Sequence, residues 1–543
     1  LVKKFTPSND IMELTDYYKV KDSEVLLILQ DQINDKKGLL IDGEVYVDYD
    51  TVVQKFNHRF YWDNNENILT YTTPTEILQA EVGTNKYTVM KSTIETSSKA
   101  DYQIVKVFGD KVYVALDFVK QYSDITAKLY NKPDRVIIDY KWGDYLFTDV
   151  TKDTQLRTEA SIKSPILLRL KSGMTLMYVD TEAPKNGFSK VMTEDGIVGY
   201  VKAGNVKKSY YKTLSNSNYK APEYTAQTRP GKINLVFHQV FNQDANSHME
   251  ALMKDTKGVT VISPTWFSVK DVSGTISSLA NESYVTKAKD LGMEVWALAD
   301  DFNTDVNMYD LLSHTSSREN LSNALIEEAL RYKLNGINID FEKITADAGS
   351  HYIEFLRELS VKCRNNGIVL SVDSYVPSAY TEYYDREEQG KIIDYVVVMA
   401  YDEYHGGSDQ AGPVASIGFV KDAVNNILTM VPKEKTIIAI PFYSRLWKEA
   451  ANGKLSAESF GMNQAETVLK ENGATAQFDP KVGCNYAEYK KDGATYQMWE
   501  EEDKSIDEKM KVIYDADVAG TAAWKLGLEK SSVWNVIVRY LNE

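Results

Sequence analysis

The stretch Asn-Gly-Ile-Asn-Ile-Asp-Phe-Glu at residues 335–342 decides the fold of the C-terminal half of this chain. Side chains alternate between the two faces of a strand, so Asn338, Asp340 and Glu342 share one face and the apolar residues share the other. Polar groups inside an apolar barrel are costly unless they are paired or functional. We therefore expect a strand with its polar face inside a barrel. A polar network without catalysis is the alternative.

Apolar, strand-like runs recur from Gly231 onward and alternate with helical patterns. Eight such runs are what a (β/α)8 TIM barrel requires, so we predict this α/β fold for residues 231–543. Active sites of such barrels lie at the carboxyl ends of the strands, which is where Glu342 stands. The runs are 233–240, 259–263, 294–299, 336–341, 368–372, 395–399, 436–440 and 520–524, and a small β insertion is predicted at about 448–515.

The first part of the chain contains a repeated pattern. Asp-Gly-Glu-Val-Tyr-Val at 42–47 and Gly-Asp-Lys-Val-Tyr-Val at 109–114 each precede a short helical pattern and then strand-like runs, which end at 68–71 and 136–139. Each copy predicts strand, short helix, strand, strand, and hence α+β repeats over residues 1–154. The pattern resembles the N-terminal repeat of copper amine oxidases, but no histidine cluster is present that could bind copper.

A second module is predicted at residues 155–212. Short alternating runs broken by glycine and proline favour a small all-β barrel. The order of Gly187, an aromatic-x-Lys-Val run at 188–191 and Gly-Tyr-Val at 199–201 resembles bacterial Src-homology-3-like domains. Such a domain either binds cell-wall peptides or acts as a spacer. Residues 213–230, rich in Ser, Asn, Tyr and Thr, predict a linker, so the whole chain is multidomain.

Composition excludes several classes of function. The formal net charge of −16 argues against nucleic acid and against an anionic membrane surface as partners. No apolar run is long enough to span a membrane. The two cysteines, Cys363 and Cys484, cannot build a metal cluster, and two buried thiols are favoured over a disulfide. We expect no metal and no cofactor. Because the chain begins Leu-Val-Lys-Lys, we expect that a secretion signal or membrane anchor was removed.

The stretch at 335–342 is similar to the signature Asp-Gly-x-Asp-x-Asp-x-Glu of glycoside hydrolase family 18. Gly336, Asp340 and Glu342 match it, whereas Asn335 and Asn338 stand at its first two acidic positions. Three further segments strengthen the resemblance. They are Met-Ala-Tyr-Asp at 399–402, Pro-Phe-Tyr-Ser-Arg-Leu-Trp at 441–447, and Trp524, where the family places a tryptophan beneath the sugar.

The resemblance implies a retaining, substrate-assisted mechanism, in which the 2-acetamido oxygen of the substrate attacks the anomeric carbon. Glu342 would then be the general acid, and Asp340 would orient the acetamido group and stabilise the oxazolinium intermediate. Tyr401 would donate its hydroxyl to the acetamido oxygen. Asn338 is expected to donate a hydrogen bond to an ionised Asp340. The resemblance implies substrate contacts for Asn338, Asp402, Tyr443, Arg445 and Trp524.

The asparagine form of the motif resembles the branch of spore cortex-lytic and sporulation-associated glucosaminidases, whose polymer is peptidoglycan. It implies a secreted monomer, associated with the cell wall or spore, that cleaves β-1,4 bonds after N-acetylglucosamine. Three alternatives stay open: a chitinase, a glycan-binding lectin of the same fold, and a structural wall protein with a vestigial barrel. For Trp266, Tyr375, Trp447 and Trp499, core packing and sugar contact are equally expected. His238 is expected to be a core histidine.

Overall fold

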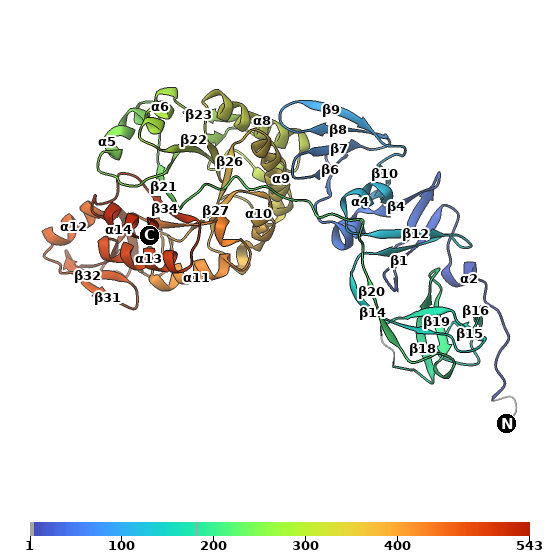
Figure 1. Cartoon of the computed structure of the whole chain (residues 1–543). Coiled ribbons are helices and arrows are strands. Elements are labelled where there is room, and N and C mark those ends of the chain that lie inside the picture. The colour runs from blue at the N-terminus through green and yellow to red at the C-terminus, as the bar shows by residue number, and fades with distance from the viewer. Residues whose placement is uncertain (1–4, 181–182, 543) are drawn as a thin grey trace. The chain divides into compact units, whose positions relative to one another are not determined.

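The computed structural model of the chain describes residues 5–180 and 183–542 (Figure 1). By its internal contacts the chain forms two compact units. The first comprises residues up to 71 together with 78–89 and 96–222, and the second comprises 72–77, 90–95 and 223–543.

The repeated pattern of the first unit forms the secondary structure that the sequence predicts. In each copy a strand leads into a helix and then into two further strands. The two leading strands, β4 (Glu44–Asp48) and β11 (Lys111–Ala115), pair antiparallel with Val47 opposite Val114. The helices that follow are α3 (Tyr49–Thr51), continued by a π-helical turn at Val52–Phe56, and α4 (Leu116–Tyr122); the closing strands are β5 (Tyr61–Asp63) and β6 (Ile68–Thr72) in one copy and β12 (Thr126–Tyr130) and β13 (Arg135–Asp139) in the other.

Two sheets hold these copies together. One has the strand order β10-β11-β4-β3-β1-β13-β12, with β2 beside β1, and the other is a meander from β5 to β9. The apolar core includes Val47 and Val114 from the leading strands of the two copies and Phe118 from helix α4. The remaining elements are α2 (Leu14–Tyr18), β1 (Glu24–Leu29), β2 (Gln32–Ile33), β3 (Gly38–Ile41), β7 (Ile77–Glu81), β8 (Lys86–Met90), β9 (Glu95–Lys99) and β10 (Val105–Phe108).

The small all-β domain is larger than the sequence predicts. Its sheet has the order β16-β15-β19-β18-β17-β14-β20 and starts at residue 143, not 155. The boundary was missed because β14 follows β13 directly in sequence, whereas its partners β17 and β20 lie far along the chain. The strands are β14 (Gly143–Asp149), β15 (Thr154–Arg157), β16 (Ile166–Leu170), β17 (Thr175–Tyr178), β18 (Phe188–Thr193), β19 (Val198–Lys202) and β20 (Tyr210–Leu214). Its likeness to Src-homology-3-like domains stays a prediction.

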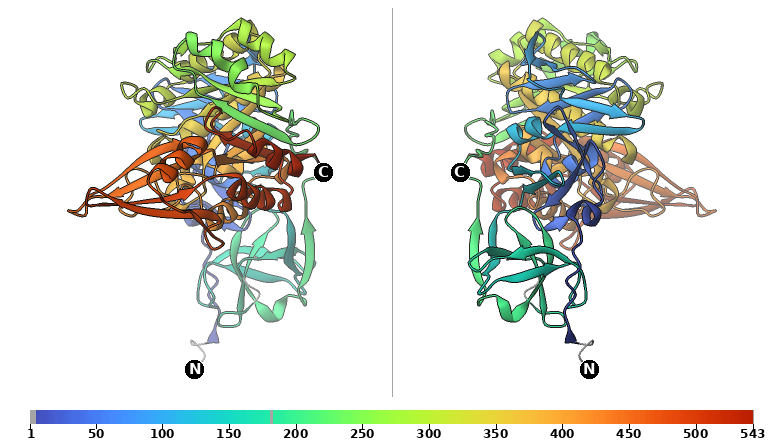
Figure 2. Two further views of the ribbon diagram at one scale, coloured as in Figure 1. Left: turned by 90° about the vertical axis from the view of Figure 1, so that its left-hand side faces the viewer. Right: turned by 90° about the vertical axis from the view of Figure 1, so that its right-hand side faces the viewer.

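The second unit is the predicted TIM barrel. Eight parallel strands close through the pairings of β21 with both β22 and β34. Helices surround these strands in the views of Figures 1 and 2. The strands are β21 (Ile233–His238), β22 (Val261–Val269), β24 (Glu294–Asp300), β25 (Gly336–Asp340), β26 (Val369–Tyr375), β27 (Tyr395–Met399), β28 (Thr436–Pro441) and β34 (Gly520–Trp524), and a short β23 (Ile276–Ser278) pairs with β22.

The barrel helices are α5 (Met249–Met253), α6 (Glu282–Asp290), α7 (Met308–Leu312), α8 (Thr315–Arg331), α9 (Gly349–Asn365), α10 (Arg386–Ile392), α11 (Ile417–Ile427), α13 (Asp503–Asp515) and α14 (Val533–Leu541). The packing follows the alternation expected for β25. Ile337, Ile339 and Phe341 belong to the large core between strands and helices. A separate cluster that includes Leu235, Trp296 and Val397 fills the barrel interior.

The insertion after β28 differs from its predicted limits of 448–515. It starts at Tyr443, because β29 (Tyr443–Glu449) already pairs with β30 and β33. It ends before α13, which is a barrel helix. A capping box starts α13: Glu502 accepts the Ser505 N–H, and the Ser505 hydroxyl accepts the Glu502 N–H. Figure 2 shows this sheet projecting from the barrel; its other elements are β30 (Leu455–Gly461), α12 (Met462–Glu471), β31 (Gln477–Asp479), β32 (Cys484–Lys491) and β33 (Ala494–Glu500).

The end of the predicted linker 213–230 belongs to the barrel. The Gln227 N–H donates to Asp394 at 2.7 Å, and Arg229 forms an ion pair of 2.7 Å with Glu294. Asp394 and Glu294 lie at the amino ends of β27 and β24. A polar stretch just before a domain predicts a linker. The contacts that make this stretch part of the barrel join residues more than 60 positions apart, which no local pattern shows.

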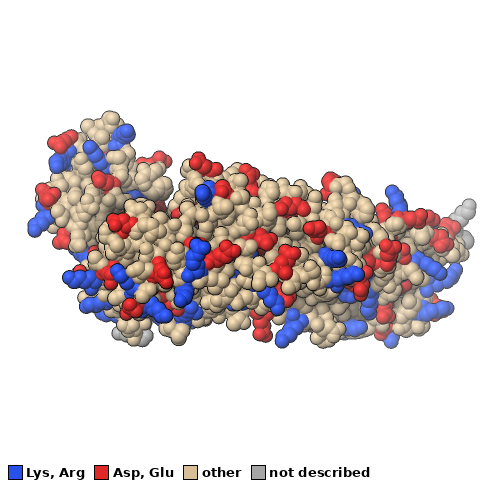
Figure 3. Space-filling view, turned by 90° about the horizontal axis from the view of Figure 1, so that it is seen from above, with Lys and Arg blue, Asp and Glu red and all other residues tan. Residues whose placement is uncertain are grey.

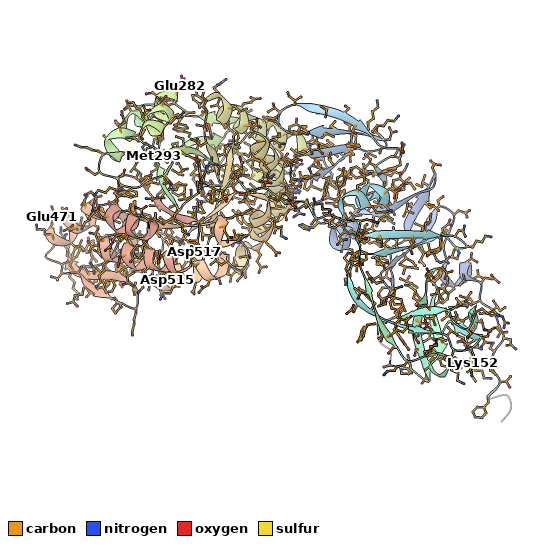
Figure 4. The ribbon with its side chains drawn as sticks, in the orientation of Figure 1. Lys152, Glu282, Met293, Glu471, Asp515 and Asp517 are labelled. Atoms are coloured by element: carbon orange, nitrogen blue, oxygen red, sulfur yellow. The ribbon has the colours of Figure 1, made fainter. Side chains whose placement is uncertain are left out.

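Surface charge is mixed. On the face drawn in Figure 3, Lys and Arg side chains lie interspersed with Asp and Glu. Asp517, labelled in Figure 4, forms ion pairs with Lys232 and Lys433 at 2.8 and 2.7 Å and so links the starts of β21 and β28.

Cys363 and Cys484 are free, buried thiols, as expected. Among the described residues, no helix has the length and apolar character needed to cross a bilayer.

Candidate active site

A cavity of about 660 Å³ opens at the carboxyl ends of the barrel strands. Most of the residues predicted to act on a substrate reach it, contributed by strands far apart in sequence. This is the position at which TIM barrels carry their active sites. The lining residues are Phe237, Phe302, Asp340, Glu342, Asp373, Tyr375, Val376, Ser378, Thr381, Met399, Tyr401, Asp402, His405, Phe419, Tyr443 and Trp524.

Glu342 is held at both its backbone and its side chain. Asp301, a buried carboxyl after β24, accepts the N–H groups of Glu342 and Lys343 at 2.9 and 2.8 Å. The Tyr375 hydroxyl donates to Glu342 Oε2 at 2.9 Å and contacts the Glu342 carbonyl oxygen at 3.1 Å. Two neighbouring strands therefore fix the direction in which this carboxyl points.

Two further carboxyls that line the cavity, those of Asp340 and Asp373, form a buried pair. Asp340 and Asp373 come from adjacent strands, β25 and β26, and are 5% and 4% exposed. Burial, then the nearby Asp373 and Glu342, raise the pKa of Asp340 well above its usual range. Burial likewise raises the pKa of Asp373. Two buried carboxyls cannot both ionise cheaply, so the pair holds at least one proton near neutral pH.

The expected hydrogen bond from Asn338 to Asp340 is not present. The Asn338 amide donates instead to Asp373 Oδ1 at 2.8 Å and to the Ser371 hydroxyl at 2.9 Å, while Asp340 Oδ1 has no hydrogen-bond partner. On β25 these side chains share a face, but neighbouring residues of one strand face point along parallel directions. The amide of Asn338 therefore reaches residues of the next strand, β26, more easily than it reaches Asp340 on its own strand. Asn338 has no exposed surface and does not line the cavity, against its predicted contact with substrate.

Aromatic groups form the cavity walls. Trp524 at the end of β34 lies 5.6 Å from Phe237, ring centre to ring centre, with a tilt of 48°. The ring of Tyr401, which follows β27, lies 6.3 Å from the ring of Tyr443, centre to centre. Burial and the nearby Asp373 raise the pKa of Tyr401, so its hydroxyl keeps its proton and can donate it in a hydrogen bond. Tyr401, Tyr443 and Trp524 thus line the cavity, and their roles toward a substrate stay predictions.

Asp402 organises one side of the entrance. The Tyr443 hydroxyl and an Arg445 guanidinium nitrogen both donate to its Oδ1 at 2.5 Å. Arg445 also donates to the Tyr404 carbonyl oxygen and to Ser459, which lies in the insertion. Arg445 does not itself line the cavity, so its position favours support of Asp402 and Tyr443 over direct contact with a sugar.

The other aromatic candidates separate clearly. Tyr375 lines the cavity. Trp266 and Trp447 are buried, and their indole N–H groups donate to Asn246 and to the Gly412 carbonyl oxygen. Trp499 packs on Tyr486 in the insertion. His238 is a core histidine, as expected: its Nδ1 lies 2.8 Å from the Tyr284 hydroxyl, and burial lowers its pKa to about 4.

The sequence analysis missed Asp373 and Asp301. The first carried a usable signal, because Ser371, Asp373 and Tyr375 repeat on β26 the inward polar alternation of β25. The second had none, since an aspartate just after a strand is an ordinary loop residue. Among residues 5–180 and 183–542, no group of three or more His, Cys, Asp or Glu side chains is arranged to hold a metal ion.

Two family models match the chain. The model described as Glycosyl hydrolases family 18 covers residues 246–529, and the model described as Copper amine oxidase N-terminal domain covers residues 30–138. The cortical fragment-lytic enzyme of Bacillus subtilis (strain 168) is 28% identical over 241 residues, which are 43% of this chain. This chain spans 56% of the length of that relative.

Solved structures show a similar fold. The C-terminal domain of a putative chitinase from Desulfitobacterium hafniense DCB-2 aligns with a TM-score of 0.52 at 21% identity, covering 57% of this chain and 99% of that domain. The spore cortex-lytic enzyme SleL of Bacillus megaterium QM B1551 aligns with a TM-score of 0.51 at 22% identity, covering 58% of this chain and 75% of SleL. At this identity the likeness concerns the barrel fold alone.

Proposed function

The chain belongs to glycoside hydrolase family 18, and from that premise we propose that it hydrolyses β-1,4 bonds after N-acetylglucosamine in peptidoglycan, with retention of configuration. The observation that carries the proposal is the fixed Glu342 above the buried pair Asp340 and Asp373, in one cavity walled by Tyr401 and Trp524. One acid, one shared-proton pair and an aromatic wall are the parts that substrate-assisted hydrolysis needs.

Glu342 acts as the general acid. It donates its proton to the glycosidic oxygen as the bond to the anomeric carbon breaks. Asp301 and Tyr375 hold its backbone and its carboxyl, so the proton is delivered from a fixed position. The departing sugar leaves as a neutral alcohol, and Glu342 is left as a carboxylate that can next activate water.

The substrate supplies the nucleophile, so no second protein carboxylate has to reach the anomeric carbon. The acetamido oxygen attacks that carbon and forms a positively charged oxazolinium ring. Asp340 faces the acetamido N–H. Asp340 and Asp373 together carry one proton and one negative charge, and the proton moves to Asp373 as positive charge develops beside Asp340. The hydrogen bond from Asn338 to Asp373 keeps the partner carboxyl in place during this transfer.

Tyr401 and Trp524 position the sugar. The protonated Tyr401 hydroxyl donates to the acetamido oxygen, which directs that oxygen toward the anomeric carbon. Trp524 stacks against the apolar face of the sugar ring. Asp402 and Tyr443, joined by a hydrogen bond, contact the sugar hydroxyls from the other side of the entrance.

Peptidoglycan is favoured over chitin as the polymer because of the names of two relatives from Bacillus subtilis. One is named for the lysis of cortical fragments (cortical fragment-lytic enzyme), and the other for sporulation (putative sporulation-specific glycosylase YdhD). The names of the same two relatives also support action in the cell wall or spore. Chitin hydrolysis is the second candidate, favoured by a relative from Drosophila melanogaster that is named probable chitinase 2 and is 27% identical over 158 residues. A sugar-binding role without catalysis is disfavoured, because Glu342 is present and held.

Digestion of purified peptidoglycan tests the proposal. Mass analysis should find new reducing ends of N-acetylglucosamine, and NMR of the first product should find the β-anomer. Glu342→Gln should bind the polymer but lose activity about 10²–10⁴-fold, the usual contribution of a general acid. An α-anomer appearing first, or full turnover by Glu342→Gln, contradicts the mechanism. Reducing ends of N-acetylmuramic acid contradict the stated bond.

A further inference from the structure

Lys525 does not itself line the cavity, but it lies next to its wall, directly after the last barrel strand, β34, and beside the end of the first, β21. It directly follows Trp524, which lines the cavity. The chain then turns back onto β21, where the Leu526 N–H donates to the carbonyl oxygen of Phe237, another lining residue. Lys525 is therefore fixed on both sides by residues of the cavity wall.

The ammonium group of Lys525 has a neutral partner. Its Nζ donates to the Gln239 side-chain oxygen at 2.6 Å, and it lies 5.8 Å from the centre of the Phe241 ring, which is 72% exposed. Among the described residues, no carboxylate forms an ion pair with it. Burial lowers its pKa, and no opposing charge compensates. An ammonium has three donors, so two stay available for a ligand.

Lys525 differs from Arg445, another cation near the cavity, in having no carboxylate partner among the described residues. Arg445 is neutralised by Asp402, whereas Lys525, which directly follows the proposed sugar platform Trp524, keeps an uncompensated charge. A partly buried cation is costly unless a counter-charge arrives. The counter-charge that fits this site is an anion carried by the substrate.

We propose that Lys525 binds a carboxylate on the 3-O-substituent of the acidic sugar in the polymer, and so selects muramic-acid-containing glycan over chitin. The inference rests on the proposed function, because chitin carries no such carboxylate. Gln239 orients the ammonium, and the apolar stem of the substituent packs on Phe241. Two sources share this chemistry: the free lactyl carboxylate of a peptide-free strand, and the carboxylates of a stem peptide attached to it.

The test compares Lys525→Met with two controls on three substrates. Lys525→Arg keeps the charge. Lys257→Met removes an exposed lysine whose Nζ also donates to an amide oxygen, that of Asn535 at 2.7 Å, away from the cavity. The substrates are N-acetylglucosamine oligomers, glycan strands stripped of peptide by an amidase, and strands with their stem peptides.

Lys525→Met should lower kcat/KM on muramic-acid-containing strands about tenfold or more, because hydrogen bonds between charged groups are strong, and leave N-acetylglucosamine oligomers unchanged. Lys525→Arg should retain most activity, and Lys257→Met all of it. Loss on stripped strands identifies the lactyl carboxylate, and loss on peptide-bearing strands alone identifies the stem. Equal effects on all three substrates overturn the inference while leaving the proposed function standing. A wild-type protein that cleaves only N-acetylglucosamine oligomers overturns both.

Discussion

At the scale of single residues, the site is organised by which strand supplies each carboxyl. The sequence motif places asparagine at 338, and the structure supplies a carboxyl from the next strand at 373. Asn338 is therefore a donor that orients Asp373, and Asp340 keeps an oxygen without a partner. A buried oxygen without a donor favours the protonated form of the acid.

Asp373→Asn tests this arrangement. It removes the negative neighbour of Asp340, so the pKa of Asp340 should fall, and one buried protonated carboxyl should disappear. Infrared difference spectra at neutral pH should lose one protonated-carboxyl band relative to wild type. Turnover should drop by about 10²-fold, at the lower end of acid–base effects.

The matched variant is Asn338→Asp, which adds a carboxyl at the same place and should raise the pKa values of the cluster. Its pH–rate profile should shift toward higher pH, while that of Asp373→Asn shifts toward lower pH. Shifts in the same direction, or spectra that are identical for all three proteins, contradict a shared proton.

At the scale of elements, sequence reasoning succeeded where the signal was periodic and local. It found all eight barrel strands, and it put Glu342 at the end of β25, because alternation and apolar runs are properties of a few adjacent residues. It failed where the deciding contact joins distant segments. The limits of β14 and β29, and the partner of Asn338, depend on pairing with residues that no local pattern specifies.

Asp301 is a contact of this kind, because it joins the end of β24 to the end of β25. Burial raises its pKa to about 6 from an ordinary 3.8. A raised pKa in the folded state means that the protonated acid favours folding. This contribution is complete below about pH 4 and is lost as pH rises through about 6. Two pKa units correspond to about 3 kcal/mol of stability.

Asp301→Asn should remove that pH dependence. In wild type, the free energy of unfolding contributed by this site should fall between pH 4 and pH 7, and in the variant it should not. The unfolding transition of the barrel can be followed by tryptophan fluorescence, because most of the eight tryptophans lie after residue 223. The variant should also lose turnover, since one backbone N–H at 342 or 343 loses its acceptor. A wild-type pH dependence in the variant contradicts the assignment.

At the scale of the whole molecule, the barrel core is formed within residues 224–541, so this part is expected to fold by itself. The place of the cut matters. Buried Asp394 accepts N–H groups from Gln227 and Leu370 at 2.7 and 2.8 Å, and Arg229 pairs with Glu294. A fragment that starts at 231 lacks Gln227 and Arg229, whereas one that starts at 223 keeps them.

The fragment 223–543 should therefore be more stable than 231–543 by about 2 kcal/mol or more, because a buried acceptor that loses a donor costs about 1–3 kcal/mol. Thermal unfolding of the two fragments measures the difference, and equal melting temperatures would mean that residues 223–230 act only as a linker.

The fragment 223–543 also tests whether the N-terminal unit serves attachment to the wall or takes part in catalysis. If the N-terminal unit adds local concentration at the wall and no catalytic group, 223–543 should match the full chain on soluble glycan and be slower on intact sacculi. Equal rates on sacculi would exclude an attachment role, and a loss on soluble glycan would mean that the N-terminal unit contributes to the site itself.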